Sequence, residues 1–388
     1  MDRDPPRIRG SLPEQIAATG AIGGIATWRA ITGVGADLRE LGFTNPHARQ
    51  AALAALSVMV SVAIACAMHL PDPWWAAISG FISTQASRPG SIRKALLRIV
   101  GTAAGAGLGL VLAGWLAYDH LACCLALFTM SAVGILGVSV SAHGYAWLFF
   151  GITFSLVVLT SLGDPQNALS VAFFRTTEVG IGTGTALLVA LALAPDGGEA
   201  PGPEAPGWTD LLGAQWPAVL HAARSGVAVA LIPIVWSWLY LPSVSQMAMT
   251  MASVLAVPHL SDHALDDGPG IVQKAVQRLL GCAFGGALAL ALLSLPLDSL
   301  LPWLLALLVG VWIGGVLQAS ARGTGYIGTQ ATVVFILTLV QGEGPPSSIL
   351  PALNRLAGIG CGLLTLFVVC LLVQPDDTRP SRSLHRPS

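Results

Sequence analysis

The chain has 388 residues, of which 54% are hydrophobic and only 10% are charged, and its net charge is −1. Soluble domains average about 25% charged residues, so this composition excludes an ordinary water-soluble enzyme, and the lack of a basic excess argues against a nucleic-acid partner. The mean hydropathy of +0.71, together with 44 Gly and 25 Pro, fits a bundle of membrane helices. We therefore predict an all-α polytopic membrane protein.

The N-terminal segment, 1–47, is mixed in character and is predicted to be cytoplasmic. Residues 14–33 are compatible with a helix at the membrane interface. The opening sequence MDRDPPRIRG carries arginines but no apolar run directly behind them, so a cleavable signal peptide is not expected.

Apolar runs bounded by Pro, Gly and charged residues predict twelve membrane spans in two halves, 48–194 and 216–375. A Pro/Gly/acidic cytoplasmic linker at 195–215 joins the halves, and 376–388 form a tail. The predicted spans of the first half are 49–69, 74–88, 95–116, 120–140, 144–162 and 169–193. Those of the second half are 217–240, 244–260, 274–294, 300–319, 325–341 and 350–373.

Basic residues predict the orientation of these spans. The even-numbered loops and the two tails hold 17 of the 19 Lys and Arg residues, whereas the odd-numbered loops hold acids such as Asp72 and Asp164 but no base. Because cytoplasmic loops carry the excess of Lys and Arg, both termini are predicted to be cytoplasmic. Arg175 and Arg355 are the two exceptions.

The two halves resemble each other. Lys94 and Lys274, the only lysines, are related by an offset of 180 in the numbering, and Arg98–Arg278 and Arg175–Arg355 keep the same offset. The strings KALLRIVGTAAG and KAVQRLLGCAFG match locally, while HLPDPW and YLPSVS match at an offset of 171. We therefore predict two parallel six-helix repeats related by an axis along the membrane normal, with a substrate site between them.

Arg175, Arg355 and Glu178 are the leading site candidates. A guanidinium can bind a carboxylate through two parallel hydrogen bonds, so the two arginines are predicted to bind an anionic substrate; snorkelling to the outer headgroups is the alternative. Glu178 is the only acid well inside a predicted span and is predicted to couple transport to protons. A structural pair with Arg175 at i, i+3 is its alternative.

Weaker candidates for substrate contact are Tyr145, Tyr326 and Thr153, for which interface belts or helix-to-helix hydrogen bonds are the alternatives. Glycines four apart, as at Gly101 and Gly105, predict close helix packing. The motifs GxxxxGK[ST], HExxH and GxSxG are absent, so neither an enzyme nor a cofactor is expected. No metal site is predicted. The histidines and aspartates of 259–267 are interpreted as a solvated loop, with a metal or regulatory site as the alternative.

The segment 144–195, GYAWLFFGITFSLVVLTSLGDPQNALSVAFFRTTEVGIGTGTALLVALALAP, resembles the fusaric acid resistance proteins, which include bacterial aromatic carboxylic acid exporters. The resemblance rests on Tyr145, Thr153, Asp164-Pro165, Arg175, Gly180 and Pro195, and on Arg98 and Gly101 in RIVGTAAGAGLG. The second half departs from this pattern, because Gly358 stands at the position that corresponds to Glu178.

This resemblance implies an inner-membrane efflux transporter for small organic anions, such as aromatic or other weak carboxylic acids, driven by protons. Plant malate channels look like distant relatives, so a passive anion channel is one alternative function. A non-transporting membrane scaffold is the other. A homo-oligomer and a periplasmic adaptor protein are compatible with the sequence. The bilayer and a small organic anion are the expected partners.

Overall fold

The computed structural model describes residues 12–42, 47–197, 205–209, 211–213, 215–239, 244–256, 268–295, 299–320, 322–342, 344–346 and 348–372. Within these ranges the regular structure is entirely helical. An N-terminal helix α1 (Leu12–Arg39) precedes the first half, which contains α2 (Ala48–Ala67), α3 (Pro73–Ser83), α4 (Arg88–Leu116), α5 (His120–Val140), α6 (Gly144–Ser161), a 3-10 turn η1 (Pro165–Asn167) and α7 (Ala168–Leu193). The second half contains α8 (Trp216–Ala230), α9 (Ile232–Leu239), α10 (Val244–Leu255), α11 (Gly268–Leu293), α12 (Leu300–Gln318), α13 (Gly325–Leu339) and α14 (Leu350–Leu372).

Each predicted span overlaps at least one helix, but several boundaries differ: α4 begins at Arg88 and α11 at Gly268, six or seven residues before the spans predicted at 95–116 and 274–294. The run predicted at 74–88 ends as α3 at Ser83, because the Ser87 side chain accepts a hydrogen bond from the Gly90 amide and begins α4. The run predicted at 217–240 is divided at Leu231 into α8 and α9. Among the described residues, nine helical segments are long and apolar enough to cross a membrane, whereas α10 and α13 are apolar but shorter.

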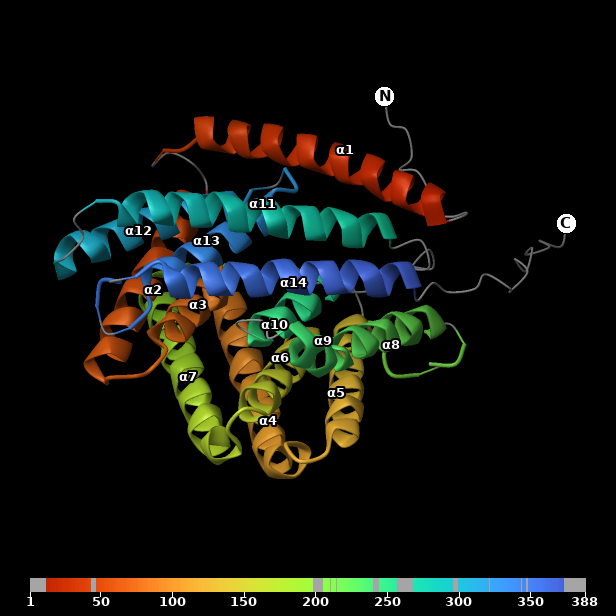
Figure 1. Ribbon diagram of the computed structural model, residues 1–388. Coiled ribbons are helices and arrows are strands. Elements are labelled where there is room, and N and C mark those ends of the chain that lie inside the picture. The colour runs from red at the N-terminus through yellow and green to blue at the C-terminus, as the bar shows by residue number, and fades with distance from the viewer. Residues whose placement is uncertain are drawn as a thin grey trace, which may run out of the picture.

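Corresponding helices of the two halves make corresponding contacts. Within the halves, α4 packs on α6 as α11 packs on α13, and α3 packs on α7 as α10 packs on α14. Between the halves, α2 packs against α12 while α8 packs against α5, and α3 contacts α13 while α10 contacts α6. The long helices α4, α5 and α7 run down the view of Figure 1, whereas α11, α12 and α14 run across it. The two sets therefore cross steeply.

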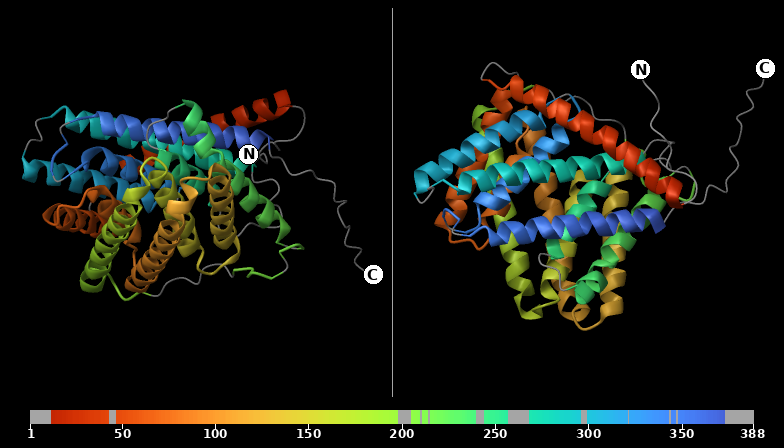
Figure 2. Two further views of the ribbon diagram at one scale, coloured as in Figure 1. Left: turned by 60° about the horizontal axis from the view of Figure 1, so that its bottom comes forward. Right: turned by 45° about the horizontal axis from the view of Figure 1, so that its top comes forward.

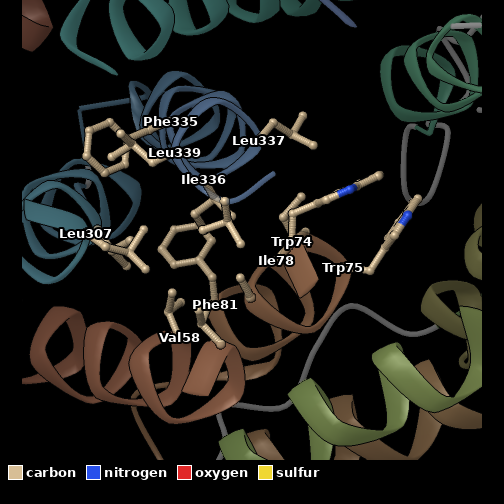
Figure 3. Close-up of a cluster of buried hydrophobic side chains, with 14 of the residues drawn as sticks. Val58, Trp74, Trp75, Ile78, Phe81, Leu307, Phe335, Ile336, Leu337 and Leu339 are labelled. Carbon is tan, nitrogen blue, oxygen red and sulfur yellow. The ribbon is translucent and has the colours of Figure 1, made fainter. Parts of the chain in front are cut away.

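The contact between the halves is built around a hydrophobic cluster. Figure 3 shows Phe81 of α3 lying between Val58 of α2 and Ile336 of α13, with Leu307 of α12 beside them. Trp74 and Trp75 lie at one edge of the same cluster. Burial of large apolar side chains stabilises such a contact by roughly 1.5–3 kcal/mol per residue in water. The same packing fixes the position of the α3 N-terminus, which carries both tryptophans.

Helix α1 lies along α11, on the face of the second half (Figure 1; Figure 2, right). Its Asp37 carboxylate is only 4% exposed and accepts hydrogen bonds from Thr324 at 2.7 Å, from Ser320 at 2.9 Å and from Arg322. The opposite face of α1 exposes Trp28, Ile25 and Ile31. A helix with one face on the protein and an apolar face outward suits the interfacial position predicted for 14–33.

Glycines allow helix backbones to touch, as the sequence predicts. A Cβ added to Gly105 of α4 would lie 2.4 Å from the Phe150 carbonyl oxygen of α6, and one added to Gly285 of α11 would lie 2.0 Å from the Ala331 carbonyl oxygen of α13. These separations are too short for any side chain. Gly107, which follows Gly105 on the same helix, has nothing within 4 Å of its added Cβ.

Gly105→Ala is therefore expected to destabilise the protein by about 1–3 kcal/mol, because α4 and α6 must move apart. Gly107→Ala is the matched control and should leave stability unchanged or slightly raised, since alanine favours a helix over glycine. Thermal unfolding of the purified protein in detergent measures both. Equal melting temperatures for the two variants would contradict the close contact of α4 with α6.

Candidate functional site

A cavity of about 100 Å³ lies between the two halves. Helices α3, α4 and α6 line it from the first half, and α10, α11, α13 and α14 line it from the second. The lining includes Trp74, Trp75, Ile82, Arg98, Leu148 and Phe149 on one side, and Gln246, Ser253, Arg278, Thr329 and Gln330 on the other.

Arg98 reaches this cavity from α4. Its side chain is held by hydrogen bonds from Nη2 to the Ser79 hydroxyl at 3.0 Å and from Nη1 to the Tyr145 hydroxyl at 3.4 Å. The guanidinium carbon lies 3.7 Å from the centre of the Phe149 ring, which is cation–π contact distance. Arg98 is only 1% exposed.

Arg278 occupies the corresponding place on α11. Its Nη1 donates to Gln330 Oε1 at 2.7 Å and its Nη2 donates to the Thr250 hydroxyl at 3.0 Å, and the residue is 5% exposed. The buried Nε–H groups of Arg98 and Arg278 both lack a hydrogen-bond partner among the described atoms. The site therefore holds donors that the described protein atoms leave unused.

Neither guanidinium has a carboxylate partner in the described part of the chain. The ion pairs there involve other arginines, and no further contact of Arg98 or Arg278 adds one. A buried charge without a partner is costly, and buried cations are normally paired. A cavity lined by two such guanidinium groups is an electrostatically favourable place for an anion.

The two walls of the cavity differ in polarity although their residues correspond in sequence. At four pairs of positions, aligned at the offset of 171 or at 181 for α6 and α13, an apolar residue of the first half corresponds to a polar residue of the second, whereas Ile78 with Met249 and Ile152 with Val333 are apolar in both halves. The four pairs are Trp75 with Gln246, Ile82 with Ser253, Leu148 with Thr329, and Phe149 with Gln330. The first wall is thus aromatic and aliphatic apart from Arg98, and the second adds amides and hydroxyls to an aliphatic lining that includes Met249, Val333 and Leu337.

A second cluster surrounds Arg175 at the N-terminus of α3. Arg175 Nη1 lies 3.1 Å from Glu178 Oε2, and Nη2 lies 3.3 Å from Asp72 Oδ2. Glu178 is 0% exposed, and its Oε1 accepts a hydrogen bond from the Asp72 amide at 2.9 Å. Glu178 is therefore engaged on both oxygens, and it fixes the start of α3 against α7.

A tryptophan stack connects this cluster with the cavity. The ring centres of Trp74 and Trp75 lie 4.4 Å apart with 30° between their planes, and both rings line the cavity. The Arg175 guanidinium lies 4.1 Å from the centre of Trp75, and that of Arg355 lies 4.7 Å from the centre of Trp74. The two arginines, which are related by the offset of 180 in the numbering, converge on one stack.

The structure separates the predicted site residues into two groups. Arg175, Glu178 and Arg355 lie around the tryptophan stack, and Arg175 pairs with Glu178, the contact that the sequence predicts as the alternative to a coupling role. Tyr145 lies beside Arg98, and Tyr326 lies next to Arg278. Thr153 is buried on α6 but does not line the cavity, so it belongs to neither group.

The sequence interpretation missed the arginines of the cavity. Counting basic residues by loop assigned Arg98 and Arg278 to the cytoplasmic set, whereas the structure buries both between the halves. The signal was present, because the two arginines are related by the offset of 180 and lie within apolar helices. Loop counting assigns a residue to one side of a membrane and carries no information about the direction of its side chain.

Among the described residues, no group of three or more His, Cys, Asp or Glu side chains is placed to hold a metal ion. The histidine and aspartate cluster at 259–267 lies outside the described residues, as does the predicted tail at 376–388.

Comparison with known proteins identifies a family. The model of the fusaric acid resistance protein-like family matches residues 45–189 and 263–369, one range in each half. No curated protein and no solved structure matches the chain. The matched ranges include Arg98, Arg175, Glu178, Arg278 and Arg355, and they confirm the family predicted from the segment 144–195. This membrane protein belongs to the fusaric acid resistance protein-like family.

Proposed function

We propose that this chain is a membrane transporter for small organic anions and that the cavity between the halves is its central binding site. One observation carries the proposal: Arg98 and Arg278 are buried, line one cavity and have no carboxylate partner among the described residues. A bound anion would supply the missing negative charge. A carboxylate suits the site because a guanidinium donates two parallel hydrogen bonds to it.

We further propose small aromatic or other weak carboxylic acids as the substrates. Phe149 and the edge of the tryptophan stack offer aromatic contact to a planar apolar group, since Trp74 and Arg175 already cover the Trp75 ring. Gln246 and Gln330, on the other wall, offer amides to a polar edge of the same molecule. The cavity of about 100 Å³ is smaller than one of about 150 Å³ that holds benzene in another protein, so the helices that line it would have to move apart to admit an aromatic acid.

The proposed architecture is twelve spans in two parallel six-helix repeats. The reciprocal packing of α2 on α12 and of α8 on α5 supports it, and so does one family match in each half. A two-fold axis along the membrane normal would require the crossing sets of long helices to tilt in opposite directions. Helix α4 has 29 residues and is about 44 Å long, which exceeds a hydrocarbon core of about 30 Å and leaves room for tilt.

Labelling of single cysteines tests this topology. In a chain whose six native cysteines are replaced, Asp164→Cys is expected to react with a membrane-impermeant maleimide in intact cells. Ser388→Cys should react only after the membrane is permeabilised, because the charge distribution places both termini in the cytoplasm. Reaction of Ser388→Cys from outside would contradict the proposed orientation.

Efflux across the bacterial inner membrane is the proposed direction. An inside-negative potential favours outward movement of an anion by about 2.3 kcal/mol per charge for each 100 mV. We propose that a proton gradient adds to this force through Glu178, whose charge and pairing with Arg175 would change on protonation. The uncompensated arginines would equally suit a passive anion channel, which is the second candidate.

Flux measurements in proteoliposomes test the function. With benzoate as the probe, a transporter is expected to show saturable flux that responds to an imposed pH gradient. Uncoupled electrogenic current without saturation would favour the channel instead. Absence of flux for benzoate and for a panel of other aromatic and aliphatic acids would contradict both candidates and favour a structural scaffold.

A further inference from the structure

Arg355 differs from its repeat equivalent in one respect that the proposed central cavity does not explain. Arg175 is paired with two carboxylates, Glu178 and Asp72. The equivalent positions of the second half hold Gly358, at the offset of 180, and Ser243, at the offset of 171. The second half has thus kept the arginine and replaced both of its acids. Arg355 is therefore repeat-equivalent in position but not in charge balance.

The donors of Arg355 are mostly unused. A guanidinium has five N–H donors, and among the described atoms Arg355 uses one, from Nη1 to the Leu337 carbonyl oxygen at 2.5 Å. The side chain is half-buried. Asp72 is the described acid that acts on it electrostatically. Both Asp72 oxygens, however, already accept hydrogen bonds, one from Trp74 Nε1 at 3.0 Å and one from Arg175 at 3.3 Å.

The place of Arg355 relative to the cavity is defined by Trp74. Its guanidinium carbon lies 4.7 Å from the Trp74 ring centre, while Trp74 also lines the cavity that contains Arg98 and Arg278. Arg355 itself is not among the cavity residues. One aromatic ring is thus common to the cavity and to the surroundings of Arg355.

We propose that Arg355 and Trp74 form a second anion site, divided from the cavity by the Trp74–Trp75 stack. This site rests on the proposed function for its place in a transport path. Its ligand is a carboxylate, held by the free edge of the Arg355 guanidinium, which lies over the Trp74 ring. A substrate leaving the Arg98–Arg278 cavity past Trp74 would bind there next, on the side of Asp72 and the acidic, base-free loops.

Equilibrium binding of radiolabelled benzoate to the full chain in detergent tests this site without requiring transport. The unmodified chain is expected to bind two benzoates, and Arg355→Gln only one. Arg278→Gln should also bind one, because it removes the cavity site and keeps the outer one. Arg355→Lys should keep two sites, with the outer one weakened by about tenfold, since a point charge loses the forked geometry. Arg49→Gln, which removes an exposed arginine that donates to the Leu193 carbonyl oxygen, is the control and should keep two.

An unchanged number of sites in Arg355→Gln would overturn the proposal, and so would a single site in the unmodified chain. Loss of all binding in Arg355→Gln, with normal elution and melting temperature, would also overturn it, because Arg355 would then act on the cavity. The proposed function is tested separately by flux. If the chain binds two benzoates but shows no flux in proteoliposomes, the outer site stands and the transport function is rejected. If the chain transports benzoate but binds only one, and Arg355→Gln does not change this number, transport stands and the outer site is rejected.

Discussion

Arg278→Gln is expected to raise the benzoate concentration needed for half-maximal transport by roughly 30-fold or more. Removing a charged hydrogen-bond partner from a buried ionic contact costs at least about 2 kcal/mol, and each factor of ten corresponds to about 1.4 kcal/mol. Arg98→Gln should have a similar effect, since both guanidinium groups line the cavity. Initial rates of benzoate flux in proteoliposomes measure the change, with Arg49→Gln as the control.

The melting temperature distinguishes a binding role from a structural one. Arg278 is buried without a carboxylate partner among the described residues, so glutamine removes an uncompensated charge while losing hydrogen bonds to Gln330 and Thr250. These effects oppose each other, and we expect no large fall in melting temperature. The melting temperature of Arg175→Gln should fall clearly, because this change leaves Glu178 buried and unpaired. If the melting temperature of Arg278→Gln falls as far as that of Arg175→Gln, Arg278 has a structural role instead of a binding role.

Glu178→Gln is expected to lower stability by about 3 kcal/mol and to remove the response of transport to a pH gradient. The buried carboxylate pairs with Arg175, and breaking a buried pair by removing one partner costs about 3–5 kcal/mol. Asp72 stays 3.3 Å from Arg175 and limits the loss. Glutamine cannot exchange a proton, so downhill benzoate exchange should continue while proton-driven accumulation stops. Melting in detergent and flux under an imposed gradient measure the two effects.

Asp72→Asn is the companion variant for this test, because it removes the other carboxylate that contacts Arg175. It should retain the response to the gradient. If accumulation survives in Glu178→Gln and is lost in Asp72→Asn, then Asp72 carries the proton. If accumulation is intact in both variants, the cluster around Arg175 is structural and the membrane potential drives export without it.

The helices were predictable because the spans of this chain are strongly apolar and clearly interrupted. The predicted run at 120–140 and the helix α5 coincide, since Asp119 caps one end and polar residues follow the other. The end of α3 was less predictable, because the Ser87 cap that begins α4 is a single hydrogen bond within a short polar segment. The division of α8 from α9 at Leu231 was predictable in principle, because Pro233 follows it and cannot donate the backbone hydrogen bond that a continuous helix needs.

The site was only partly predictable, for a physical reason. Arg175 and Glu178 are one helical turn apart, so their pairing follows from helix geometry alone. The surroundings of Arg98 depend on contacts with Ser79 and Tyr145, which lie on other helices far along the chain. The convergence of Arg175 and Arg355 on Trp74 and Trp75 likewise depends on how the halves pack. Such contacts have no local signature.

The unlike walls of the cavity have a consequence for how specificity can change. Two identical six-helix subunits around a symmetric cavity would present every side chain twice, so one substitution would alter both walls together. In this chain the corresponding positions are encoded separately, and Phe149 can face a wall that carries Gln330. Selection, or an engineer, can therefore change the aromatic residues of one wall without changing the amides and hydroxyls of the other. The arginine of each half can meanwhile stay the same.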